Sequence, residues 1–285
     1  MKLYRIRTRR GLLVAAAALS ALFLTPFAAR AQKLTPEELV AKHLASIGTK
    51  EARASVKSRL MAGGVVLTLR GGGVGQNTGL AVLFSEGKKS VIGMSFRNPT
   101  YPHDKFGYDG QNVTISYIKP GIRSEIGDFI KQRDQLLRLG LLGGALNTGW
   151  ALEDLGDKDV KLEYAGTAKV EGKSAHKLRL TPKKGSDVKI TLYFDEETFR
   201  HVRTEYEQLV SAREEQQVGA GRLGQAPVGG GGVDSPKEYQ RELRLKLTED
   251  FSDFKEIGKL TLPHTYKISL DMDRNQRGKY QADWL

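Results

Sequence analysis

FSDFKEIGKLTLPHTYKI, residues 251–268, is the stretch that decides the fold class. Apolar and polar residues alternate in both halves, and Gly258 lies in a short turn between them. A period of two is typical of a strand with one buried face, so two such runs around a glycine-containing turn predict a β-hairpin. Pro263 has no N–H for a sheet ladder, which predicts a place near the start of the second strand or at a sheet edge.

The same alternation recurs along most of the chain and predicts a mainly β protein with a few helices. Ile190, Leu192 and Phe194 alternate with polar residues, which indicates one strand face against a core and the other toward water. Hairpin turns are predicted at 86–87 and 109–110. Eleven strands are predicted, nearly all sequential and antiparallel, at residues 61–70, 78–86, 89–96, 104–108, 112–118, 161–170, 174–181, 188–194, 199–209, 238–251 and 259–272.

Two helices are predicted before the first strand, and a third interrupts the strands. Thr35, Pro36 and Glu38 form a helix start, with a threonine cap, a proline in the first turn and a glutamate three residues after the cap. A second helix is predicted over 50–60. Residues 124–142 form the third, which is amphipathic in its first half and apolar nearly all round in its second. Such an apolar helix is buried on several sides or lies against lipid.

The N-terminus has the three regions of a secretory signal peptide. A basic segment precedes a short apolar run over 11–24, and Ala29-Arg30-Ala31 supplies the small-x-small pattern that signal peptidase reads. Cleavage before Gln32 is predicted, which removes residues 1–31 and leaves a periplasmic protein. The arginine pair in the basic segment also resembles a twin-arginine signal, so the export route stays open, and a retained N-terminal anchor is the alternative to cleavage.

Composition and charge narrow the classes of partner. The chain has no cysteine, which excludes a lipid-modified N-terminal cysteine, disulfides and thiolate metal sites. The net charge is +12, but part of it lies in the signal segment, and the other lysines and arginines are scattered among acidic residues. This pattern argues against nucleic-acid binding and allows transient contact with an anionic membrane surface.

No motif for catalysis, a metal or a cofactor is recognisable. The five histidines are far apart in sequence, and neither HExxH nor GxSxG occurs. The glycine-rich run 70–79 joins two predicted strands and lacks the lysine that ends a phosphate-binding loop. Residues 211–236 are rich in glycine and have no aromatic residue, which predicts a flexible insertion between neighbouring strands. We therefore predict a protein that is not an enzyme and binds no metal or cofactor.

The chain resembles the outer-membrane lipoprotein carrier and sorting proteins, the family with the LolA-like fold, over roughly residues 35–275. The resemblance lies in TPEELVAKHLASIG, KFGYDGQNVTI, YAGTAKVEGKSAHKLRL, VKITLYFDEETFRHVRTEY and the closing hairpin. It implies a single domain over 32–285, an incomplete antiparallel β-barrel with helices across its mouth and an apolar cavity for acyl chains. The implied function is that of a monomeric periplasmic protein that binds acyl chains of lipid or lipoprotein, as a carrier in outer-membrane lipoprotein sorting.

The leucine-rich helical segment is the candidate ligand-binding region. Gly140, Gly143 and Gly144 weaken its end and allow close approach or hinge motion. The alternative is an ordinary core helix packed on a sheet. If the segment instead covers a hydrophobic cavity, the residues that contact the ligand are Phe129, Ile130, Leu136, Leu137, Leu139, Leu141 and Leu142.

Two other functions fit the same pattern of strands. A domain of the same fold could sense envelope stress or bind a protein partner. An integral outer-membrane β-barrel is the second alternative, which the exported context and Trp284 near the C-terminus suggest. The sequence shows no belts of aromatic residues, and their lack argues against that alternative.

Overall fold

In the computed structural model the chain divides into two units, Met1–Leu34 and Thr35–Leu285. All described residues except Leu34 belong to the second unit. The predicted signal peptide at 1–31 and the predicted insertion at 211–236 lie outside the described residues. The structure describes residues 34–70, 74–155, 160–183, 187–210, 243–273 and 279–284.

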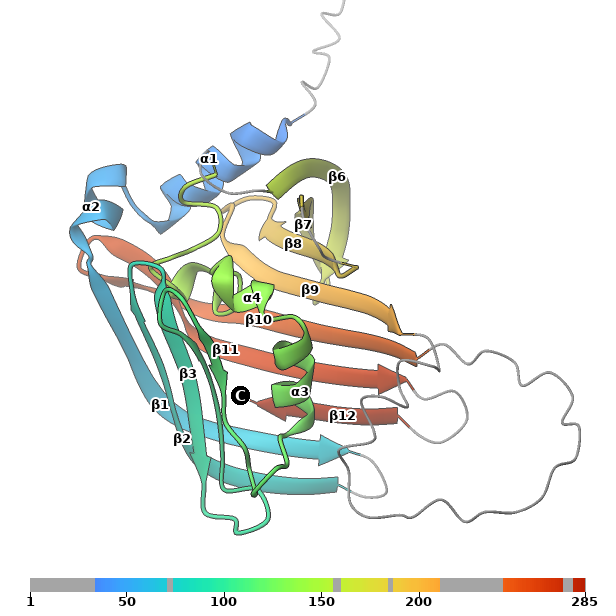
Figure 1. The fold of residues 1–285 in the computed structure, drawn as a ribbon. Coiled ribbons are helices and arrows are strands. Elements are labelled where there is room, and N and C mark those ends of the chain that lie inside the picture. The colour runs from blue at the N-terminus through green and yellow to red at the C-terminus, as the bar shows by residue number, and fades with distance from the viewer. Residues whose placement is uncertain are drawn as a thin grey trace, which may run out of the picture. The chain divides into compact units, whose positions relative to one another are not determined.

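Twelve antiparallel strands form one continuous sheet in the order β5-β4-β3-β2-β1-β12-β11-β10-β9-β8-β7-β6 (Figure 1). The C-terminal strand β12 pairs with both β1 and β11 and therefore joins the first five strands to the other six. The strands are β1 Ser58–Arg70, β2 Val74–Glu86, β3 Lys89–Phe96, β4 His103–Tyr108, β5 Val113–Ile115, β6 Val160–Val170, β7 Lys173–Pro182, β8 Lys189–Asp195, β9 His201–Val210, β10 Leu243–Ile257, β11 Leu260–Asp273 and β12 Lys279–Trp284.

The sheet is curved but not closed. Among the described residues its order ends at β5 and β6 instead of returning on itself. Helices α3 (Glu125–Gln132) and α4 (Gln135–Arg138) lie inside the curve (Figure 1). The predicted fold class, an incomplete antiparallel β-barrel with helices, is confirmed. Twelve strands replace the predicted eleven because residues 279–284, for which no strand was predicted, form β12.

The hairpin predicted over 251–268 is formed by β10 and β11. Ile257 pairs with Leu260 across the turn, and Gly258 takes the left-handed backbone conformation there, with φ of 61°. Pro263 pairs with Phe254 of β10, while β12 pairs with β11 only from Ile268 onward. Pro263 therefore lies where β11 has a described strand on one side only, and its missing N–H interrupts no second ladder.

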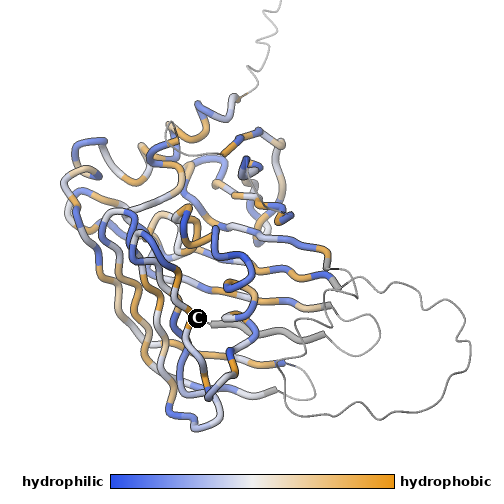
Figure 2. Tube along the Cα trace, in the orientation of Figure 1, coloured by the Kyte–Doolittle hydropathy of each residue, from blue (hydrophilic) through white to orange (hydrophobic). Residues whose placement is uncertain are grey.

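The two faces of the sheet differ in burial. Along β2 and β3, Leu83 and Ile92 are buried on the inner face, whereas Leu80 and Val82 are exposed on the outer face. Figure 2 colours the trace by hydropathy, and both hydrophobic and hydrophilic positions occur along the strands. The other strands follow the same rule of period two. Their buried inner residues include Val65, Leu67, Phe106, Leu178, Leu180, Ile190, Leu192, Phe194, Leu247 and Leu270.

The two helices at the start of the described chain differ in how well they were predicted. In α1 (Pro36–Ile47) Thr35 and Glu38 cap each other's backbone N–H groups, as predicted. Helix α2 (Lys50–Ser55) is shorter than the predicted 50–60. The prediction was wrong there because β1 already pairs with β2 from Ser58 onward. Sheet pairing outweighs local helix propensity there.

The predicted helix over 124–142 is broken into short pieces. Ser124 caps α3 by accepting a hydrogen bond from the N–H of Gly127. Arg133 ends α3, because its guanidinium turns back to donate to the Phe129 carbonyl, 2.9 Å away, and lies over that phenyl ring. Gly140 follows α4 with a left-handed φ of 70°. A 3₁₀ turn, η1 (Gly144–Leu146), completes the segment.

No helix among the described residues has the length and apolar character needed to cross a membrane.

Candidate functional site

Residues 125–152, here called the cover segment, lie across the inner face of the sheet. Helix α3 packs on β4 and β5, α4 packs on β4, and η1 packs on β9 and β11. The segment therefore reaches from one half of the sheet to the other (Figure 1). Gly143 lies against Leu83 of β2, since a Cβ added to this glycine would come within 2.9 Å of that leucine side chain.

The residues predicted to contact a ligand all lie in the cover segment. Six of them are at most 4% exposed: Phe129, Ile130, Leu136, Leu137, Leu141 and Leu142. Leu139 is half-buried. In this conformation their side chains fill space over the inner face, so a ligand that reaches that face must displace them. Whether they contact a ligand stays a prediction.

Glu249 of β10 is the main polar anchor of the cover segment. Its carboxylate is fully buried and accepts hydrogen bonds from the Gly143 N–H at 2.8 Å, from the Tyr206 hydroxyl at 2.6 Å and from the Tyr266 hydroxyl. Burial raises the pKa of Glu249 from 4.5 to about 7, although its three donors act in the opposite direction. A carboxyl of this kind changes charge near neutral pH, so the charge of this anchor depends on pH in that range.

A cluster of buried rings holds the other end of the cover segment. The indole N–H of Trp150 donates to Nε2 of His43 at 2.9 Å, so Nδ1 of His43 carries the proton and donates to the Phe199 carbonyl at 3.1 Å. Trp150 also stacks on His201, with 5.0 Å between ring centroids. Burial lowers the pKa of His43 to about 4 and lowers the pKa of His201 as well, so both rings are neutral at neutral pH. The His43 side chain is fully buried, and both of its ring nitrogens are hydrogen-bonded.

The first half of the sheet holds the same segment through backbone contacts. Arg59 of β1 donates to the Ala145 carbonyl at 2.6 Å. The N–H of Thr148 donates to the Ser85 hydroxyl at 3.0 Å, and the Thr148 hydroxyl donates to the Gly87 carbonyl at 3.1 Å. The cover segment is therefore tied to β1 and β2 on one side and to β9, β10 and β11 on the other.

Arg133 places a buried cation within the cover segment. Its side chain is only 3% exposed, burial lowers its pKa to about 10, and it remains charged at neutral pH. Its Nη1 donates to its own helix, and Nε has no hydrogen-bond partner among the described residues. A buried cation with so few partners makes closure of the cover segment at this part of the inner face less favourable than closure with a purely apolar core.

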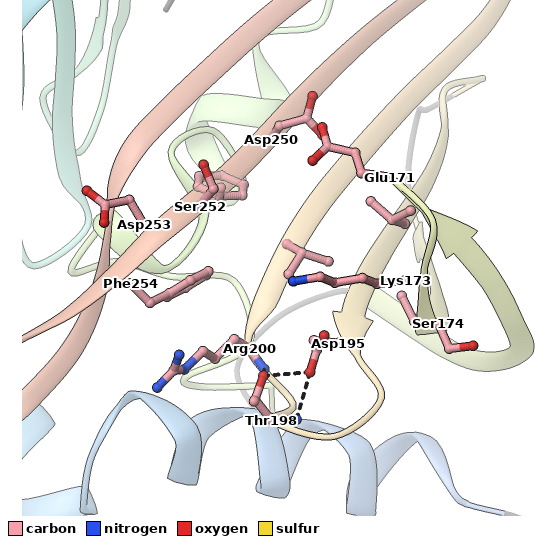
Figure 3. A pocket seen from close by; sticks show the side chains of 14 residues that line it. Glu171, Lys173, Ser174, Asp195, Thr198, Arg200, Asp250, Ser252, Asp253 and Phe254 are labelled. Atoms are coloured by element: carbon pink, nitrogen blue, oxygen red, sulfur yellow. Dashed lines mark hydrogen bonds between the residues drawn. The ribbon is translucent and has the colours of Figure 1, made fainter.

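A separate pocket of about 290 Å³ opens near the β6–β7 and β8–β9 turns (Figure 3). Asp250 lines it and directly follows Glu249 in β10, so these two side chains point to opposite faces of the strand. Its charges have both signs. Asp250 pairs with Arg203, and Asp195 accepts hydrogen bonds within its own turn, including both the N–H and the hydroxyl of Thr198. The mixture of charges defines no ligand class.

Sequence reasoning found the cover segment but missed Glu249. The signal was present, because Leu245, Leu247, Glu249 and Phe251 occupy the inward positions of one strand. A glutamate at one of the inward strand positions that otherwise hold apolar residues predicts either a buried polar anchor or a functional group. For metals, the described part of the chain contains no group of three or more histidine, aspartate or glutamate side chains that could hold an ion.

Three solved structures show what the chain is similar to. A LolA superfamily protein from Nitrosomonas europaea has a TM-score of 0.42 at 13% sequence identity, with 88% of this chain and 92% of that chain covered. A domain described as an outer membrane lipoprotein-sorting protein, from Vibrio parahaemolyticus, has a TM-score of 0.41 at 13% identity, with 86% and 88% covered. The MucA/MucB complex of Pseudomonas aeruginosa gives a TM-score of 0.24 at 13% identity, with 86% and 92% covered.

At 13% identity and TM-scores below 0.5, these likenesses establish neither the fold nor the role of this chain. A comparison with protein-family models gives no match, and a comparison with curated proteins gives no significant match either.

Proposed function

We propose that this protein binds acyl chains of a lipid or lipoprotein on the inner face of its half-open barrel, as a periplasmic carrier and without catalysis. The cover segment occupies the binding face in the conformation described above. Binding then requires the segment to move, and the acyl chain takes over the apolar contacts that the segment makes.

The observation that carries this proposal is that the cover segment is apolar toward the sheet and broken into short pieces. Toward the sheet it presents buried apolar side chains such as Leu136, Leu141 and Leu142. It is interrupted by left-handed glycines at Gly140 and Gly143 and contains no helix longer than eight residues. A segment of short pieces has less internal cooperativity than one long helix, so it can be displaced in parts.

The free energy gained by burying an acyl chain in place of the cover segment is sufficient for moderate affinity. Each methylene removed from water gains ~0.8 kcal/mol, so about ten methylenes of an acyl chain would gain roughly 8 kcal/mol before costs. Displacing the cover segment and fixing the ligand offset much of this gain. Affinity in the micromolar range is therefore expected.

A photoreactive acyl ester tests the proposal without altering the protein. After irradiation and proteolysis, the label should appear on peptides of the cover segment and on inward positions such as Leu83 or Leu247. Native mass spectrometry of protein purified from the producing cell should show the natural ligand as added mass. Labelling confined to outward-facing positions would refute binding at the inner face.

A charged double substitution separates a displaceable cover from an ordinary core. Leu139→Glu with Leu142→Glu should abolish binding of the acyl ester. If both leucines are core only, the buried charges should instead unfold the domain, which circular dichroism would show. The matched control is Leu209→Glu with Ile257→Glu, since these apolar side chains are exposed. A folded Leu139/Leu142 variant that binds like the wild type would end the idea of a cover.

A further inference from the structure

The outer face of β1 and β2 carries exposed apolar side chains where water-facing strands usually carry polar ones. Leu60 and Leu80 are 66% and 70% exposed, and Val82 and Phe84 are 42% and 38% exposed. These four residues are here called the outer patch. They are four of the seven large hydrophobic side chains that are exposed among the described residues.

Strand register makes the outer patch continuous. Leu60 pairs directly with Phe84, and Leu80 and Val82 pair with Gly64 and Ala62 of β1. The small partners leave no bulky side chain standing between the larger ones. The next strand continues the same flat surface, because Val82 pairs with Gly93 of β3. A contiguous exposed apolar surface of this kind marks an interaction site more often than scattered single residues do.

The surroundings of the outer patch are basic. Lys57 precedes β1, Lys88 lies exposed in the β2–β3 turn, and Lys89 is exposed at the start of β3, near the Leu60–Phe84 pair. Lys105 of β4 reaches the same face, since a Cβ on Gly93 would come within 3.9 Å of its Cγ and 3.5 Å of Cγ2 of Val82. The acidic neighbour, Glu86 at the end of β2, is already within 3.9 Å of Lys89.

We infer that the outer patch docks on the surface of an anionic lipid bilayer. Exposed apolar side chains surrounded by lysines match a membrane interface, where apolar groups enter the boundary between headgroups and acyl chains and lysines pair with lipid phosphates. The occupant is not a second copy of the chain, because a two-fold dimer through this face would bring the same lysines together. The inner face stays free during docking, because Leu83 and Phe84 point to opposite sides of β2.

Vesicle co-sedimentation tests the inference. Wild-type protein should bind vesicles of phosphatidylcholine mixed with phosphatidylglycerol, and should bind pure phosphatidylcholine vesicles much less. Leu80→Ser with Phe84→Ser should lower the partition coefficient by about tenfold or more, because two apolar side chains no longer enter the interface. Lys88→Gln and Lys105→Gln should each lower it by about fivefold, and salt should have a similar effect.

The matched control is Leu209→Ser with Ile257→Ser, which removes two equally exposed apolar side chains elsewhere and should leave partitioning unchanged. All four changed leucine, phenylalanine and isoleucine side chains are exposed, so both double variants should stay folded. Partitioning that is absent in the wild type, or reduced equally by the control, would overturn the inference. So would a wild-type dimer in analytical ultracentrifugation that Leu80→Ser with Phe84→Ser dissociates. Binding of the acyl ester is measured on the same variants and should not change, which separates this inference from the proposed function.

Discussion

Closure of the cover segment should depend on pH through Glu249. The carboxyl holds its proton more firmly when the segment is closed, because burial raises its pKa to about 7 although the Gly143 N–H acts in the opposite direction. In an open state water would reach Glu249 and its pKa would return toward the ordinary 4.5. The stabilisation of the closed state that comes from this proton is therefore present at low pH and is lost as the pH rises through about 7.

The size of the effect follows from the two pKa values. With about 7 in the closed state and 4.5 in a fully solvated open state, raising the pH from about 6 to about 8 shifts the equilibrium toward opening by up to about tenfold. A ligand that needs the open state gains apparent affinity by the same factor. Groups that face Glu249 do not remove the effect in this window, because burial and the nearby charge of Glu249 raise the pKa of Tyr206 and Tyr266 well above 10.

The assay is titration with a neutral fluorescent acyl ester, whose own charge is constant, at several values between pH 6 and pH 8. Hydrogen exchange of the amides in the cover segment, corrected for the intrinsic pH dependence of exchange, provides a second reading that needs no ligand. Glu249→Gln should make both readings independent of pH. Glu205→Gln is the matched control, since Glu205 also accepts from a tyrosine, Tyr193, but belongs to the outer side of β9. A Glu249→Gln variant that keeps the wild-type pH dependence would refute the reasoning.

Three further outcomes are expected. Gly144→Ala should lower the free energy of unfolding by about 1–3 kcal/mol more than Gly172→Ala does. Both glycines have positive φ, but of the two only Gly144 would bring an added Cβ into a clash, with a ring nitrogen of His201 2.7 Å away. Equal losses measured by urea unfolding would contradict this. Acid should destabilise the fold between about pH 6.5 and pH 4, because the unfolded chain protonates His43 before the folded state does. His43→Gln should remove roughly 3 kcal/mol of that loss, and a wild-type stability that is flat over this range would exclude the argument. The exported protein should begin at Gln32 by intact mass, and a species that retains residues 1–31 in the membrane fraction would show that the signal segment is an anchor.

The strands were predictable because most of them pair with their neighbours in sequence. Alternation alone was enough for the hairpin over 251–268, where β10 and β11 follow each other. It did not reveal β12, whose partners include β1 at the other end of the sequence. Lys279–Trp284 does alternate in polarity, but a short run of this kind is assigned as a strand only by its tertiary pairing.

The cover segment shows the same division between local and tertiary causes. Its apolar character and its glycines are properties of the sequence, so its place over the sheet could be predicted. The break at Arg133 could not, because it depends on where the guanidinium finds a carbonyl and a ring. The role of Glu249 depends on Gly143, which is far from it in sequence and meets it only when the sheet curves.

The strands that hold the cover segment inside are also those that carry the outer patch outside. Arg59, which binds the Ala145 carbonyl, directly precedes Leu60 of the outer patch, and Ser85, which binds the Thr148 N–H, directly follows Phe84. Consecutive residues of a strand point to opposite faces, so any shift of β1 and β2 that seats Leu60 and Phe84 in a bilayer also moves the groups that hold the cover segment. Close packing transmits such shifts instead of absorbing them. Docking through the outer patch would therefore act on the contacts that must break before an acyl chain can reach the inner face.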